Sequence, residues 1–145
     1  MYGYWPRYFW QISIRTPMLE PLFDAIYSRF LATPFAAELT DLYNTEADDE
    51  AIMPYGTFSL PDNTPDWAFT DRFENCTIQF SLFSETPTCK EITDAATALK
   101  AAFDFFDLVV IGFTTVSMTR GVASLFKVKG KWQYNVIYEI KIQND

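Results

Sequence analysis

The sequence predicts an α+β domain: an antiparallel (mixed) β-sheet with two α-helices packed on one face and a long C-terminal β-hairpin. Two segments space their apolar residues as an amphipathic helix does, and several others alternate apolar and polar residues as half-buried strands do. Between the last two alternating segments, Lys-Gly-Lys at 129–131 provides a tight turn. The expected order is therefore a helix, three strands, a helix and three strands.

The first helix is expected to begin near Glu20. Thr16–Pro17 is a start signal, and Pro21 is tolerated only in the first helical turn, so the regular part begins close to it. Thr33–Pro34 ends the helix. Its apolar residues form one stripe that would face the sheet: Leu19, Leu22, Phe23, Ile26, Tyr27 and Phe30.

Three strands are predicted in the middle of the chain. Residues 38–44 form a short one, residues 55–60 a second, and residues 67–83 a longer third. Segment 61–66, rich in proline and aspartate, has the chemistry of a turn between the last two. The second half of the third strand alternates cleanly and has one apolar face: Cys76, Ile78, Phe80 and Leu82.

The second helix is predicted to start with a capping box. Thr88 would cap the helix, and the Glu91 side chain would reach back to the Thr88 amide. The apolar stripe of this helix consists of Ile92, Ala95, Ala96, Leu99 and Phe103.

The rest of the chain is predicted to be strand. Residues 107–113, which are apolar after Asp107, are expected to form a buried strand, and residues 114–128 continue as an arm of the hairpin, with Gly121 at a bulge. Residues 132–142 form the last strand, which is long for a globular protein. Its apolar face consists of Trp132, Tyr134, Val136, Tyr138, Ile140 and Ile142.

The charge and the residue counts exclude several classes of function. The net charge is −8, with 19 acidic and 11 basic residues, which opposes tight electrostatic binding of DNA or RNA. The chain has no histidine, which excludes Ser–His and Cys–His mechanisms and the common zinc sites. No apolar run reaches about 18 residues, so neither a transmembrane helix nor a membrane partner is indicated. Cys76 and Cys89 are expected to be reduced thiols, in a chain that is soluble and intracellular when synthesised.

No group of residues points to catalysis, a metal or a cofactor. The acidic run at 45–50 is interpreted as a solvated loop; a cation site is the alternative, but the run lacks the ligand spacing and the glycine of a calcium loop. Asp104 and Asp107 flank an aromatic segment, and nothing suggests that they converge. Cys89 begins a helix, where a thiolate is favoured, but no histidine can act with it. The sequence therefore predicts no enzyme.

Aromatic residues make up 18% of the chain, more than a small core easily hides. Six of the first ten residues are aromatic, so residues 1–15 are predicted to be an N-terminal arm outside a single domain at 16–145. The arm either packs across its own domain or docks on a neighbouring subunit. The residues predicted to contact a partner are Tyr4, Trp5, Trp10, Trp67, Arg120 and Phe126. For Trp67 a place in the core is the alternative, and for Arg120 an ordinary surface charge.

Four segments follow one another in an informative order: MPYGTFSLPDNTPDW…FENCTIQFSLFSE, the helix EITDAATALKAAFD, LVVIGF and WQYNVIYEI. In this order and spacing, over about residues 17–142, the chain resembles the tail completion proteins of tailed bacteriophages, small neck proteins that include the tail terminators. Residues 1–15 lie outside the resemblance.

The resemblance implies a structural virion protein without cofactors. Proteins of this kind form a ring, commonly of six subunits, on the head-proximal end of the tail tube, where the ring stops tube polymerisation and joins the tail to the head-side connector. The implied partners are further copies of the chain, the tail tube protein and a neck or head completion protein, while DNA passes through the lumen without specific binding. The implied location is the virion, after synthesis in the host cytoplasm. A head completion protein (stopper or adaptor) is the alternative, followed by a small ligand-binding α+β domain or enzyme.

Overall fold

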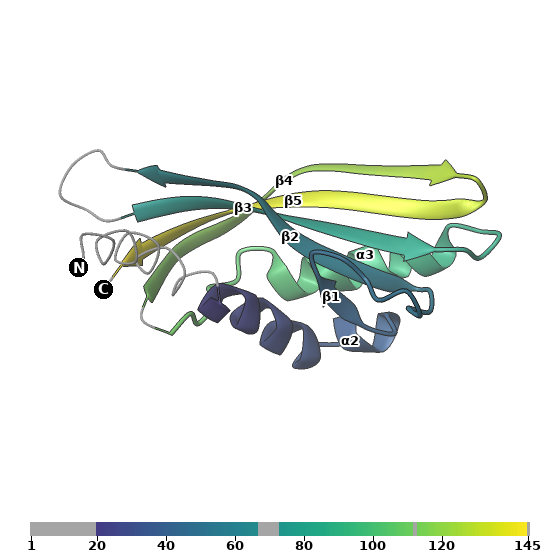
Figure 1. Cartoon of the computed structure of the whole chain (residues 1–145), viewed down its shortest axis with the longest axis horizontal. Helices are drawn as coiled ribbons and strands as arrows, with labels where there is room; N and C mark the ends of the chain where they lie inside the picture. The colour runs from purple at the N-terminus through teal and green to yellow at the C-terminus, as the bar shows by residue number, and fades with distance from the viewer. Residues whose placement is uncertain (1–19, 67–72, 112, 145) are drawn as a thin grey trace, which may run out of the picture.

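The computed structural model describes residues 20–66, 73–111 and 113–144, and it has helices on one face of a twisted β-sheet (Figure 1). The predicted α+β fold class is confirmed. The long C-terminal hairpin is confirmed as well, as β4 (Phe113–Val128) and β5 (Lys131–Asn144). The predicted arm at residues 1–15, the start signal at Thr16–Pro17 and Trp67 lie outside the described residues.

The described part of the chain forms a sheet with the strand order β1-β2-β3-β5-β4. β1 (Leu42–Asn44) runs parallel to β2 (Tyr55–Asp66), and the other neighbouring pairs, including β2 with β3 (Phe73–Ser84), are antiparallel. The sheet is therefore mixed, and β1 and β4 lie at its opposite edges. β1 covers only Gly56–Phe58 of β2, whereas β4 pairs with β5 along nearly its full length.

Helices cover one face of this sheet (Figure 1). Residues 20–31 are helical, and α3 spans Lys90–Phe103. The predicted stripe of α3 is buried, as are three residues of the first helical stripe: Leu22, Ile26, Phe30, Ile92, Ala95, Ala96, Leu99 and Phe103. Phe23 and Tyr27 of the first stripe are partly buried against the core. Both helices therefore pack through the faces that the apolar spacing predicts.

A short helix between these two, α2 (Phe35–Glu38), is not predicted by the sequence. One helical turn is too short to show a periodic apolar pattern. Its Phe35 is fully buried, with its ring centroid 5.1 Å from that of Phe30 and 6.3 Å from that of Phe103, both edge-to-face. α2 thus links the first helix to α3 through one aromatic ring.

The core lies between the helices and the inner face of the sheet. At its centre, the ring of Phe80 lies 4.9 Å from that of Phe103 and 5.7 Å from that of Tyr138, measured between centroids. The alternation predicted for β3 and β5 is confirmed by the buried residues Cys76, Ile78, Phe80, Leu82, Tyr134, Val136, Tyr138 and Ile140. Burying each large apolar side chain contributes about 1.5–3 kcal/mol.

The predicted capping box at Thr88 is wrong. α3 begins at Lys90, and Cys89 occupies the N-cap position without a capping side-chain hydrogen bond. Instead of reaching back along the helix, Glu91 accepts a hydrogen bond at 2.6 Å from the hydroxyl of Ser84 at the end of β3. Ser84 is fully buried, so its hydroxyl needs a partner, and the carboxylate supplies one. Glu91 therefore ties α3 to the sheet.

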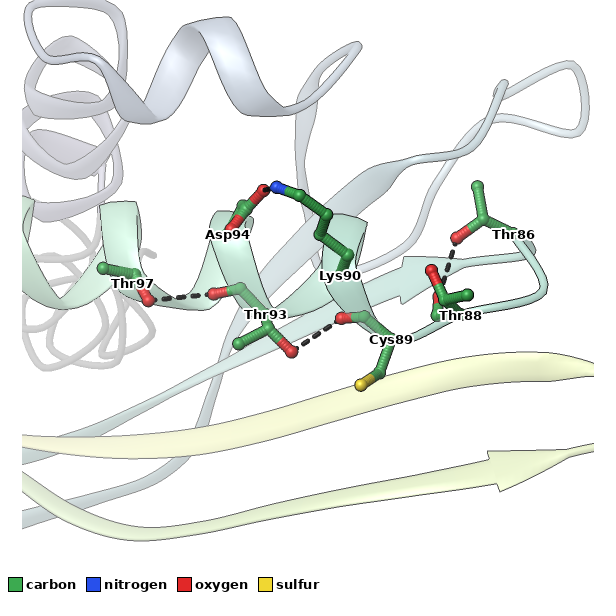
Figure 2. A network of polar contacts seen from close by, with 7 residues as sticks. All are labelled: Thr86, Thr88, Cys89, Lys90, Thr93, Asp94 and Thr97. Atoms are coloured by element: carbon green, nitrogen blue, oxygen red, sulfur yellow. Dashed lines mark hydrogen bonds and ion pairs between the residues drawn. The ribbon is translucent and has the colours of Figure 1, made fainter.

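Side chains in the first turns of α3 make contacts along the helix itself, as Figure 2 shows. The Thr93 hydroxyl donates to the Cys89 carbonyl at 2.6 Å, and the Thr97 hydroxyl donates to the Thr93 carbonyl at 3.0 Å. Lys90 and Asp94 form an ion pair at 2.7 Å. These five residues are exposed, so the outer face of this helix end is polar.

The turn predicted at residues 61–66 is wrong, because β2 continues through this segment and pairs with β3. The pairing register shifts between Ser59 and Asp62, on either side of Pro61. Proline cannot donate a ladder hydrogen bond, and an irregularity of this kind accommodates it within a strand. The short strand predicted at 38–44 is confirmed in its last three residues, as β1.

The buried strand predicted at residues 107–113 is also wrong, because residues 107–111 lie outside the sheet without regular secondary structure. Leu108 and Val110 are buried, but Val109 and Ile111 are 81% and 82% exposed. An apolar run reveals neither its partners nor how many of its sides are covered. Here the run is covered on one side only.

Candidate assembly surface

The tip of the β4–β5 hairpin is a two-residue turn, Lys129–Gly130, which confirms the predicted tight turn. Both residues have positive φ, 51° and 80°. This pattern is that of a type I′ turn, whose twist matches the twist of the flanking strands. Val128 and Lys131 consequently still pair directly before the turn.

A bulge interrupts β4 where Gly121 predicts one. The register shifts between Arg120 and Ala123, so that Gly121 and Val122 together lie opposite Ile137. A Cβ added to Gly121 would meet its nearest neighbour, the Ile137 carbonyl oxygen, at 3.4 Å. The bulge leaves the side chain of Val122 76% exposed.

From just before the bulge to its end, β4 is exposed on both of its faces. Every residue from 119 to 131 is exposed. They include large apolar side chains: Val122, Leu125, Phe126 and Val128. Among the described strands, β4 also has no neighbour on its outer edge. An exposed strand edge that carries apolar side chains is a ready template for contact with another chain.

Two of the six predicted contact residues lie on β4, and the structure gives them different surroundings. Phe126 is 38% exposed, near the hairpin tip. Arg120 Nε lies 3.3 Å from Asp104 Oδ1, and the Tyr138 hydroxyl donates to the same oxygen at 2.5 Å. Arg120 therefore helps to fasten β4 to the end of α3. The other four residues lie outside the described part of the chain: Tyr4, Trp5, Trp10 and Trp67.

The hydroxyl groups around Asp104 are held neutral. Burial, followed by the hydrogen bond to Asp104, raises the pKa of Tyr138 far above its ordinary value. Burial also raises the pKa of Tyr134, two residues earlier on the same face of β5. Neither group is suited to exchange protons near neutral pH. This cluster is a structural clamp at the base of the exposed strand.

A second exposed apolar patch, which the sequence does not predict, follows α3. It consists of Phe105, Val109 and Ile111, each more than 80% exposed. Phe105 has a φ of 56°, in a region that bulky residues rarely adopt. The aromatic sequence FDFFD was the only signal of this patch, and it does not show which ring is exposed.

The second patch borders a groove of about 450 Å³ beside the first helix. Arg29 fixes one wall of this groove: its guanidinium lies 3.5 Å from the centroid of the Phe106 ring, and its Nε donates to the Ala102 carbonyl at 2.8 Å. The helix also contributes Glu20 and Asp24 to the lining. The groove is therefore apolar along the 106–111 segment and polar along the helix.

The described residues offer no constellation for metal chemistry, since no three His, Cys, Asp or Glu side chains among them gather closely enough to hold an ion. Cys76 is buried and Cys89 is exposed. Nor does this part of the chain contain a helix that is long and apolar enough to cross a membrane. The described surface offers two regions for contact with another protein: the outer half of β4, which is residues 119–128, and the second patch.

No protein-family model matches the chain, and no curated protein matches its sequence. The fold does match solved structures. One of these is a chain from the structure described as the virion of a native gene transfer agent (GTA) particle, with a TM-score of 0.79 and 17% sequence identity. The match covers 88% of the present chain and 98% of that chain. The two chains therefore share a fold over nearly all of the virion chain.

Proposed function

We propose that this chain is a structural protein of a phage-like virion. The observation that carries the proposal is the fold match, because it extends over 98% of a chain that is itself part of a virion particle. The surface of the described residues is consistent with such a role, since it presents exposed apolar strand and loop segments.

Within the virion, we propose the role of a tail completion protein. The chain would form a ring at the head-proximal end of the tail tube, terminate tube polymerisation and join the tail to the head-side connector. The resemblance of the segment order over residues 17–142 supports this finer role. The partners would be further copies of the chain, the tail tube protein and a neck protein.

A ring requires contacts that pair two different surfaces of each subunit and then close. The two edges of the sheet are such different surfaces. β4 has 16 residues and an open outer edge, whereas β1 has three residues and leaves most of β2 uncovered. Aromatic residues such as Phe126 supply contact area at low entropic cost.

The face of the sheet opposite the helices suits a passage for DNA. Its described side chains alternate with those that face the helices, and they include uncharged polar ones, Thr57, Ser59, Gln79, Asn135 and Ser124, beside Tyr55, Phe83, Ile137, Glu139 and Lys141. Such groups offer DNA no array of cations, and the net charge of −8 repels phosphate. DNA would therefore pass this surface without being retained.

Electron microscopy of lysates from the encoding phage, with this gene disabled, tests the proposal. Overlong or headless tails are expected if the chain terminates the tube. Filled heads that leak DNA beside tails of normal length would instead identify a head completion protein. Normal infectious particles would contradict a structural role and would favour the alternative of a small ligand-binding domain.

A further inference from the structure

Charge is segregated between two segments of this chain. Residues 119–131 contain four basic residues and no acidic one: Arg120, Lys127, Lys129 and Lys131. Residues 38–50 contain six acidic residues and no basic one: Glu38, Asp41, Glu46, Asp48, Asp49 and Glu50. For a chain with a net charge of −8, a hairpin end that is wholly basic is a departure from the average.

The two segments belong to opposite edges of the sheet. The basic one is the outer half of β4 with its turn, and the acidic one surrounds β1. Three strands separate β1 from β4 in the order β1-β2-β3-β5-β4. A contact between a basic edge and an acidic edge therefore suits two copies of the chain placed side by side.

We propose that the outer half of β4 and its lysine-rich turn dock on the acidic segment beside β1 of a second copy of this chain. The contact is head-to-tail, because each copy uses a different edge toward each neighbour. This proposal rests on the proposed function, which requires a ring, and it names the two surfaces that meet in that ring. Opposite charges would steer the edges together and set their register.

The charges on each side are available for such a contact. Lys129 and Lys131 are exposed at the tip, and Lys127 lies with its Nζ 5.1 Å from the centroid of the Trp132 ring. On the acidic side, Asp41 already accepts hydrogen bonds from the Tyr27 hydroxyl and the Leu42 amide. The acidic groups offered to a neighbour are instead the exposed ones: Glu46, Asp48, Asp49 and Glu50.

Apolar side chains accompany the charges on both edges. Val122, Leu125 and Phe126 are exposed on β4. Ile52, two residues after the acidic run, is 69% exposed. An interface with an apolar centre and a charged rim is the usual anatomy of protein contacts. Nucleic acid fits the basic edge less well, because four cations on a chain of net charge −8 provide few phosphate contacts, and exposed aliphatic side chains add none.

Charge reversal on each edge tests the proposal with the full chain. One variant carries Lys127→Glu, Lys129→Glu and Lys131→Glu; the other carries Glu46→Lys, Asp48→Lys and Asp49→Lys. Association is measured by sedimentation velocity over a range of protein and salt concentrations. The wild-type chain is expected to associate more weakly as salt rises, and each variant alone is expected to associate at least roughly tenfold more weakly than wild type at low salt.

Mixing the two variants is the decisive arm. In the mixture the unaltered edges attract each other, and so do the two reversed edges, so association is expected to return toward the wild-type level. A control variant with Thr97→Glu and Ala101→Glu makes the chain more acidic on the exposed face of α3, which packs over the inner strands β3 and β5, and should associate as wild type does.

Three outcomes would overturn the proposal: a wild-type chain that stays monomeric at low salt and high concentration, variants that associate like wild type, or a mixture that fails to recover. Retention of a labelled DNA duplex, lost in the lysine variant, would assign the basic edge to nucleic acid instead. Recovery of association on mixing would stand even if disabling the gene left virions normal, so the two proposals can fail separately.

Discussion

The Tyr138 hydroxyl donates a hydrogen bond to Asp104 Oδ1 across 2.5 Å and thereby joins β5 to the residue that ends α3. Arg120 on β4 lies 3.3 Å from the same oxygen. Two strands and a helix end thus meet at one carboxylate. The exposed outer half of β4 begins directly beyond this junction.

Tyr138→Phe removes this hydrogen bond and leaves Asp104 with Arg120. We expect the free energy of unfolding to fall by about 1.5–3 kcal/mol, because a hydrogen bond to a charged group is stronger than a neutral one. Urea denaturation followed by fluorescence measures the change. Tyr27→Phe is the matched control: its hydroxyl donates to Asp41 at 2.9 Å from a half-buried position, so its loss should be smaller. Equal effects would count against a special role for the Asp104 junction.

The same hydroxyl makes stability depend on alkaline pH. Its pKa is raised in the folded chain, whereas an unfolded tyrosine titrates near a pH of about 10. The stabilisation is therefore complete below about pH 10 and is lost as the pH rises, because the unfolded chain releases the proton first. We expect the free energy of unfolding to decline above about pH 10 and Tyr138→Phe to reduce the slope. Identical slopes in the two proteins would contradict this assignment.

Gly56→Ala should destabilise the fold, because buried leucine side chains occupy the space that a Cβ would need. A Cβ there would be 2.8 Å from Leu82 Cδ2 and 3.1 Å from side-chain atoms of Leu39 and Leu42. Overpacking of a core typically costs about 1–3 kcal/mol, which thermal denaturation would resolve. Gly121→Ala is the control, because its nearest contact is an ordinary one at 3.4 Å. A similar loss in both variants would refute the steric argument.

Phe35→Ala should lower the free energy of unfolding by about 3–5 kcal/mol, because it opens a cavity between Phe30 and Phe103. Phe105→Ala removes the same ring from a position that is 83% exposed, and its effect should stay within about 0.5 kcal/mol. Chemical denaturation of both variants gives the comparison. A large loss in Phe105→Ala would show that its ring is packed in solution.

The two thiols should differ in reactivity. Cys89 is exposed at the start of α3, and Cys76 is 1% exposed within β3. A maleimide added to the native chain is expected to modify Cys89 rapidly and Cys76 only after unfolding. Mass spectrometry of the digested protein identifies the labelled residue. Rapid labelling of Cys76 under native conditions would mean that β3 opens locally.

The sequence correctly predicts those helices and strands in which the spacing of apolar residues repeats several times. The alternation over Cys76 to Leu82 and the stripe of α3 are both buried as predicted. The misplaced features depend on neighbours far along the chain. Glu91 is drawn from its capping position to a buried Ser84 hydroxyl, and residues 61–66 are held as strand by pairing with β3.

The candidate surface is predicted only in part. Phe126 and the Lys-Gly-Lys turn are visible in the sequence because a hairpin tip has a local signature. The exposure of Phe105, Val109 and Ile111 has no such signature, because apolar segments of this kind are usually buried. The charge segregation can be counted in the sequence, but the strand order is needed to place its two halves at opposite edges.

The two-sided exposure of β4 beyond the bulge has a consequence for motion. Every residue of that half-strand is exposed, so backbone hydrogen bonds to β5 supply much of what holds it in place. Segments with few buried contacts open locally at a small fraction of the global unfolding free energy. The amides of residues 121–128 should therefore exchange with solvent faster than those of β3 in an isolated subunit. An edge that opens locally in the isolated subunit and becomes ordered against a neighbour would couple its own ordering to assembly.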